Sequence, residues 1–90
     1  MKIKEKEFDE LLQELKAVAD QLGVSVRFEK GDFKGGYCIV HDKKVIVINK
    51  MTNLQRKVMI LSSALKELGV EDIYLSPRIR EVIEEMSGLS

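Results

Sequence analysis

The stretch Gly35–Asn49, GGYCIVHDKKVIVIN, decides the fold that this sequence encodes. Two runs of β-favouring residues, 37–41 and 44–48, flank a short polar turn at Asp42-Lys43. Side chains alternate between the two faces of a strand, and both faces of these runs are apolar. We therefore predict a two-stranded hairpin that needs cover on both sides. Helices of the same chain would cover one side, and a third helix or a partner subunit the other.

The residues before the hairpin predict a helix and an edge strand. Apolar residues recur at three- and four-residue steps over 5–22, and Gly23 follows as a C-terminal cap. Residues 24–29 then alternate between apolar and polar side chains, which is typical of a strand with one wet face at a sheet edge. The glycine-containing segment 30–36 predicts a turn region.

Two further helices are predicted after the hairpin. Thr52 and Gln55 have the spacing of a capping box, with Thr52 as N-cap of a helix that runs to about Leu68. Residues 70–75 predict a brief strand or an extended connection. Ser76-Pro77 starts a last helix, because serine suits the N-cap and proline the first helical position. Its predicted buried side is Ile79, Val82, Ile83 and Met86.

Together these patterns predict one α+β domain over residues 1–90. The expected order is an N-terminal helix, a three-stranded antiparallel meander, a long helix and a short C-terminal helix. The hydrophobic fraction of 44% and the charged fraction of 33% are those of a folded protein rather than a disordered one. No apolar run approaches the roughly 20 residues of a membrane span, and residues 1–10 lack the apolar core of a signal peptide. We expect a cytoplasmic protein.

Cys38 and His41 are the catalytic candidates, since a thiolate nucleophile is usually activated by a nearby histidine. Their odd separation on one strand places the two side chains on opposite faces, so they cannot form a local pair. We therefore expect Cys38 to be a small buried core residue and His41 a solvated residue beside the turn. The chain has 1 cysteine and 1 histidine, so we expect neither a metal site nor a cofactor.

The segment 27–57 is the basic part of the chain. It carries 8 basic and 3 acidic side chains, although the whole sequence has 15 of each. Aromatic side chains interleaved with cations are what single-strand binders use. The candidate contacts to a nucleic acid or a protein partner are Lys34, Tyr37, Lys43, Lys44, Lys50 and Arg56. The alternative interpretation is a solvated basic edge, because charged side chains on an edge strand also block sheet-to-sheet aggregation.

The chain has two resemblances. Over residues 8–68, the segment LGVSVRFE, a glycine-bearing loop and KVIVIN before a helix resemble the N-terminal part of the small zinc metallopeptidases that inactivate phage repressors. In that family the helix carries His-Glu-x-x-His. Here it is MILSSALKELG, with Ser63, Ala64 and Glu67 near the positions of the ligands and base, so no catalytic residue or metal carries over. The segments GDFKGGYCIV, KVIVINK and LSPRIREVIEE also resemble a group of short uncharacterised bacterial α+β proteins, which implies no activity.

We therefore expect a small non-enzymatic protein that acts by association, as a homodimer or with a protein partner. The observation behind this expectation is a short chain whose hairpin is apolar on both faces. The alternative is binding of RNA or single-stranded DNA through residues 27–57. A weaker alternative is an enzyme that uses Cys38.

Overall fold

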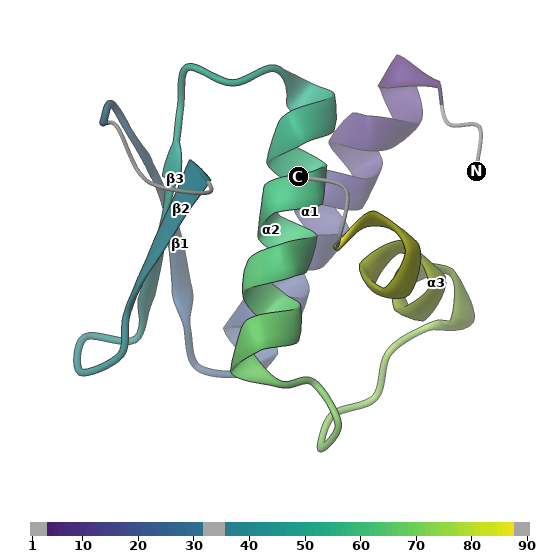
Figure 1. Cartoon of the computed structure of the whole chain (residues 1–90). Coiled ribbons are helices and arrows are strands. Elements are labelled where there is room, and N and C mark those ends of the chain that lie inside the picture. The colour runs from purple at the N-terminus through teal and green to yellow at the C-terminus, as the bar shows by residue number, and fades with distance from the viewer. Residues whose placement is uncertain (1–3, 32–35, 88–90) are drawn as a thin grey trace.

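The computed structural model describes residues 4–31 and 36–87, which form helices and a mixed three-stranded sheet (Figure 1). The elements in chain order are α1 (Glu5–Gln21), β1 (Ser25–Glu29), β2 (Tyr37–Val40), β3 (Val45–Asn49), α2 (Leu54–Leu68) and α3 (Pro77–Met86). The α+β class and the order of helices and strands are confirmed.

The predicted antiparallel meander is wrong. β2 and β3 form the expected antiparallel hairpin, but the strand order is β1-β3-β2 and β1 pairs with β3 in parallel. The parallel register runs from Ser25 opposite Val45 to Glu29 opposite Asn49. The backbone N–H of Lys50 continues it by donating to the carbonyl of Glu29 at 3.0 Å.

Burial explains why β3 takes the central position. Its residues Ile46 and Ile48 are both fully buried, and a central strand satisfies its backbone hydrogen bonds on both sides. β1 has exposed side chains at every second position, so it suits an edge, where one face stays in water. A meander would have placed β2 in the centre and the most apolar strand at an edge.

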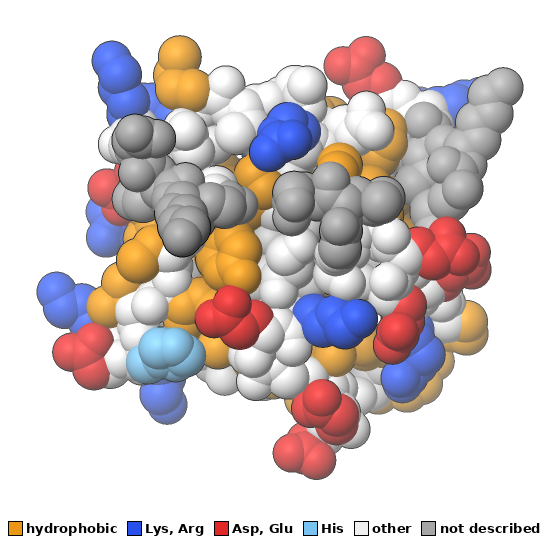
Figure 2. All heavy atoms as spheres, in the orientation of Figure 1, with side chains coloured by type: hydrophobic (Ala, Val, Ile, Leu, Met, Phe, Trp, Pro, Cys, Tyr) orange, Lys and Arg blue, Asp and Glu red, His pale blue; other side chains and the backbone are white. Residues whose placement is uncertain are grey.

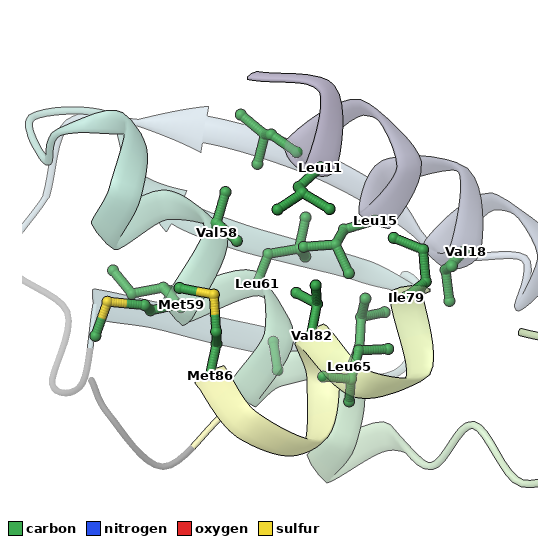
Figure 3. Packing of buried hydrophobic residues seen from close by; sticks show 14 of the residues in the cluster. Leu11, Leu15, Val18, Val58, Met59, Leu61, Leu65, Ile79, Val82 and Met86 are labelled. Carbon is green, nitrogen blue, oxygen red and sulfur yellow. The ribbon is translucent and has the colours of Figure 1, made fainter. Parts of the chain in front are cut away.

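The helices lie on one side of the sheet in two successive layers (Figure 1). α1 and α2 pack directly on the sheet, and α3 packs against them on the side away from it. Figure 3 shows Leu11 and Leu15 of α1 meeting Leu61 and Leu65 of α2. The same core extends to the predicted buried residues of α3, which are Ile79, Val82, Ile83 and Met86.

The helix ends follow local chemistry with one correction. Gly23 follows α1 with a φ of +74°, and Gly69 caps α2 with a φ of +94°, a region that favours glycine. The N-cap of α2 is Asn53, whose Oδ1 accepts from the N–H of Arg56 at 2.8 Å, so the predicted capping box at Thr52 is wrong. Asparagine is as good an N-cap as any residue, and it lies one position closer to the helix.

The last connection and the last helix complete the fold. Ser76 caps α3 as predicted, because its hydroxyl accepts from the N–H of Ile79 and Pro77 follows at the first position. Residues 70–75 contain no strand, and the connection is not fully extended, because it includes a turn in which the N–H of Ile73 donates to the carbonyl of Val70. Leu75 anchors this connection in the core, where it is 4% exposed.

Candidate functional site

The sheet face turned away from the helices is the most distinctive surface of the described chain. In the β2–β3 register, Cys38 lies opposite Val47 and Val40 lies opposite Val45, so these four side chains share that face. The three valines are half-buried and Cys38 is exposed. No helix of the described chain covers them (Figure 1). We call these four residues the outer patch.

A polar rim borders the outer patch along β1. Arg27 lies opposite Val47 in the parallel register and shares its face. The Nε of Arg27 forms an ion pair with Oε2 of Glu29 at 3.2 Å, and both side chains are largely exposed. The rim therefore presents one positive and one negative charge beside an apolar surface.

The expectation that Cys38 is a buried core residue is wrong. Cys38 is exposed, because the face to which it points receives no third helix. α3 packs behind α1 and α2 instead, where its own apolar stripe is covered. The side-chain alternation was correct, and the missing information was which face the helices would cover.

His41 is a solvated residue of the β2–β3 turn, as predicted. It is the pale blue side chain near the lower edge of the sheet in Figure 2. The residue lies beyond the end of β2, and no hydrogen bond or ion pair joins it to Cys38. Within the described residues, no group of three histidine, cysteine, aspartate or glutamate side chains could hold a metal ion.

The structure does not bring the predicted basic contacts together. Lys43 and Lys44 lie in the turn that precedes β3, whereas Lys50 follows the far end of β3 and Arg56 lies in the first turn of α2. Figure 2 accordingly shows Lys and Arg side chains at both ends of the sheet rather than in one patch. Lys34 lies outside the described residues.

Tyr37, another predicted contact, is held against α2. Its hydroxyl donates a hydrogen bond to Oε1 of Glu67 at 2.6 Å. This hydrogen bond, together with partial burial and the negative charge of Glu67, raises the pKa of Tyr37 to about 12. The ring is half-buried against the core, so it is not a free stacking platform.

Three residues of α2 near the positions of the metallopeptidase ligands and base make structural contacts in this chain. Glu67 accepts the hydrogen bond of Tyr37, and the hydroxyl of Ser63 donates to the carbonyl of Met59 at 3.0 Å. Ala64 is fully buried in the core. These three positions therefore serve core packing and hydrogen bonding.

Two pockets lie elsewhere on the described surface. One, of about 350 Å³, is formed where α1 and α2 begin, and its lining is Glu5, Phe8, Asn53, Leu54 and Gln55. The other, of about 250 Å³, lies between α1 and the connection to α3, beside Tyr74, which is 78% exposed. Glu5 is the titratable residue in the lining of the first pocket, and Glu14 and Tyr74 are those in the lining of the second.

Sequence reasoning missed one feature, in which the ring of Phe28 is flanked by two lysines. The Nζ of Lys16 lies 5.7 Å from the ring centroid and the Nζ of Lys57 lies 5.4 Å from it. The three residues come from α1, β1 and α2, so no local pattern could have joined them. The sequence indicates only that Phe28 lies on the apolar face of its strand, together with Val26, and that this face packs against helices.

The comparisons with known proteins add no family. No protein-family model, curated protein or solved structure matches this chain. None of the helices in the described part of the chain has the length and apolarity that crossing a bilayer requires.

Proposed function

We propose that this chain is a protein-interaction module that forms a homodimer through the outer patch. The observation that carries the proposal is that the β2–β3 hairpin is apolar on both faces but receives helices on one face only. Water contact along Cys38, Val40, Val45 and Val47 costs free energy that a second sheet would recover.

The geometry of sheet packing suggests the form of the dimer. Two sheets pack face to face about 10 Å apart, with the side chains of the inner faces interdigitated. Two copies of this chain would give four central layers in the order helix, sheet, sheet, helix. A two-fold axis through the outer patch would make the contact self-complementary and closed.

The two opposite charges of the polar rim favour binding of a second copy of this chain over binding of a strongly charged partner. Arg27 and Glu29 place opposite charges side by side along β1. In a two-fold symmetric dimer, Arg27 of one copy can therefore face Glu29 of the other. A strongly acidic or basic partner would meet a like charge in part of this rim. The chain as a whole has a net charge of 0, so two copies do not repel each other over long distances.

The size of the face predicts weak association. Three strands of five residues or fewer span roughly 15 by 17 Å, whereas a stable interface buries roughly 800 Å² on each partner. We therefore expect dissociation in the micromolar range and a dimer fraction that depends on protein concentration.

Cys38 provides a direct test, since it lies in the outer patch and is the only cysteine. A short bismaleimide reagent should convert the native protein into a covalent dimer at tens of micromolar. The yield should fall on dilution in parallel with the dimer fraction measured by sedimentation. Cys38→Ser should abolish the covalent product and leave the sedimentation result unchanged.

A matched pair of charge variants separates the outer patch from other surfaces. Val47→Lys places a charge at the centre of the patch and should raise the Kd of the dimer at least about tenfold. Gln13→Lys adds the same charge on the exposed side of α1 and should leave the dimer intact. A monomer at all concentrations, or a dimer that persists in Val47→Lys, would contradict the proposal.

A further inference from the structure

Two lysines from different helices lie at one aromatic ring, and neither has an acidic partner within residues 4–31 and 36–87. The Nζ atoms of Lys16 and Lys57 lie 5.7 and 5.4 Å from the centroid of Phe28, within the roughly 6 Å range of a cation–π contact. The ion pairs of the described residues join Arg27 to Glu29 and Arg78 to Glu7, so neither lysine forms an ion pair with a described carboxylate.

The two ammonium groups act on the same region of the surface. Their distances to the Phe28 centroid place the two Nζ atoms no more than about 11 Å apart, close to the Debye length of about 10 Å at 0.1 M salt. An anion near the ring would therefore be attracted by both charges.

The parallel pairing of β1 and β3 brings two more cations to the same end of the sheet. Phe28 lies opposite Ile48, and Lys30 and Lys50 come directly after the two strands. The hydrogen bond from the N–H of Lys50 to the carbonyl of Glu29 places the two strand ends side by side. In the antiparallel meander, these two lysines would not have followed the same end of paired strands.

The acidic residue nearest in sequence is engaged elsewhere. Glu29 lies on the sheet face opposite to Phe28, since the two are adjacent on β1, and it is paired with Arg27. Lys16 and Lys57 at the Phe28 ring, together with Lys30 and Lys50 after the adjoining strand ends, therefore form a local positive surface among the described residues of a chain of zero net charge. We call it the Phe28 cluster.

We propose that the Phe28 cluster binds a phosphate group. Ammonium groups are strong point-charge ligands for phosphate oxygens, and two of them lie at the same ring. The phosphate can be free in solution or part of a single-stranded nucleic acid backbone. Because Phe28 is flanked by its two lysines, it positions cations rather than stacking on a base, so recognition would not depend on base sequence.

The test uses the full chain and two probes, inorganic phosphate and a fluorescent oligothymidylate. Binding is measured at low salt by calorimetry and by fluorescence anisotropy. Lys16→Gln combined with Lys57→Gln should weaken binding at least tenfold. For the oligonucleotide it should also reduce the slope of log K against log salt by about 0.7, the value expected for one neutralised phosphate on a single strand.

The control removes the same charge from other places. Lys43 lies in the turn at the opposite end of β3, and Lys66 lies in the last turn of α2. Lys43→Gln combined with Lys66→Gln should change the affinity for either probe less than twofold. Lys16→Arg combined with Lys57→Arg keeps both charges and should retain binding, which distinguishes lost charge from lost folding.

Each outcome decides the proposal. Binding of phosphate but not of the oligonucleotide, lost in the Lys16/Lys57 double glutamine variant, supports a small phosphate ligand. Binding of the oligonucleotide with the same loss supports a nucleic acid backbone. The absence of binding to both probes at low salt overturns the proposal, and so does an equal loss in the Lys43/Lys66 control.

Discussion

The hydroxyl of Tyr37 donates a hydrogen bond of 2.6 Å to the carboxylate of Glu67, 30 residues further along the chain. This bond joins β2, which is an edge strand, to the C-terminal half of α2. It is the one described hydrogen bond between side chains of the sheet and of a helix. It therefore ties the edge strand to the helix layer.

The Tyr37–Glu67 bond makes stability depend on pH in the alkaline range. The pKa of Tyr37 is raised from 10.0 to about 12 in the folded protein, so its contribution is fully present below about pH 10 and is lost as the pH rises through 12. Tyr37→Phe should cost about 1 kcal/mol of unfolding free energy at pH 8, allowing for partial solvent screening, and almost nothing above about pH 12.

Chemical denaturation of the parent protein and of the Tyr37→Phe variant across this pH range measures the difference. A Tyr74→Phe background leaves one tyrosine, and its ultraviolet titration should then centre near pH 12. A stability difference between the parent and the variant that stays constant through pH 12 would show that the phenol does not donate to Glu67.

Ser62 is a position at which substitution by alanine should stabilise the protein. It is fully buried in α2, and its hydroxyl oxygen has no hydrogen-bond partner among the described residues. Ser62→Ala should raise the unfolding free energy by about 1 to 2 kcal/mol, since it removes an unsatisfied polar group and improves helix propensity. Urea denaturation gives the value directly.

Ser63→Ala is the matched control for Ser62→Ala. It brings the same gain in helix propensity, about 0.5 kcal/mol, but removes a hydroxyl that donates to the carbonyl of Met59. Ser63→Ala should therefore stabilise the protein less than Ser62→Ala does. If Ser62→Ala proves less stable than Ser63→Ala, the Ser62 hydroxyl has a partner that compensates its burial.

Alanine substitutions of the two residues before α2, Thr52 and Asn53, should differ in how much they lower the unfolding free energy. Asn53→Ala removes the side chain that accepts from the N–H of Arg56, and it should cost about 1 kcal/mol. Thr52→Ala removes a hydroxyl whose only described bond, to the carbonyl of Asn53, is 3.4 Å long, and it should cost less than about 0.5 kcal/mol. Thermal melting of the two variants ranks them, and a larger loss at Thr52 would restore the capping box that the sequence predicted.

Gly36 is a position at which one added methyl group should lower the unfolding free energy. Its φ is +88°, and an added Cβ would lie 2.6 Å from Cδ1 of Ile60, which is fully buried. Gly36→Ala should therefore cost about 2 to 3 kcal/mol, from backbone strain and overpacking together. Gly23→Ala shares the positive φ but meets nothing within 4 Å, so it should cost only about 1 kcal/mol.

A double variant isolates the overpacking at Gly36. Ile60→Val removes the methyl group that the added Cβ would meet, at a cost of about 1 kcal/mol in the native background. In the Gly36→Ala background the same change should cost less or become favourable. Additive effects in this double-mutant cycle would show that backbone strain alone accounts for the loss.

The sequence by itself determined the local elements of this protein. The apolar stripes of α1, α2 and α3 follow from the 3.6-residue period, and the hairpin follows from alternation on either side of Asp42-Lys43. Gly23 and Ser76-Pro77 mark helix ends because their backbone preferences act within a few residues. The same reasoning placed the N-cap of α2 one residue early, since Thr52 and Asn53 are both suitable caps.

Only the tertiary structure decided which strands are neighbours and which sheet face stays uncovered. Strand order is a competition over burial across the whole sheet, and β3 gained the centre because Ile46 and Ile48 are buried there. Because the helices all pack on the same side of the sheet, Cys38 is exposed and the outer patch is uncovered. The strand order also aligned the ends of β1 and β3, and the packing of α1 and α2 on the sheet placed Lys16 and Lys57 at Phe28. Side chains so distant in the sequence share no local signal, and only the packing of the elements brings them together.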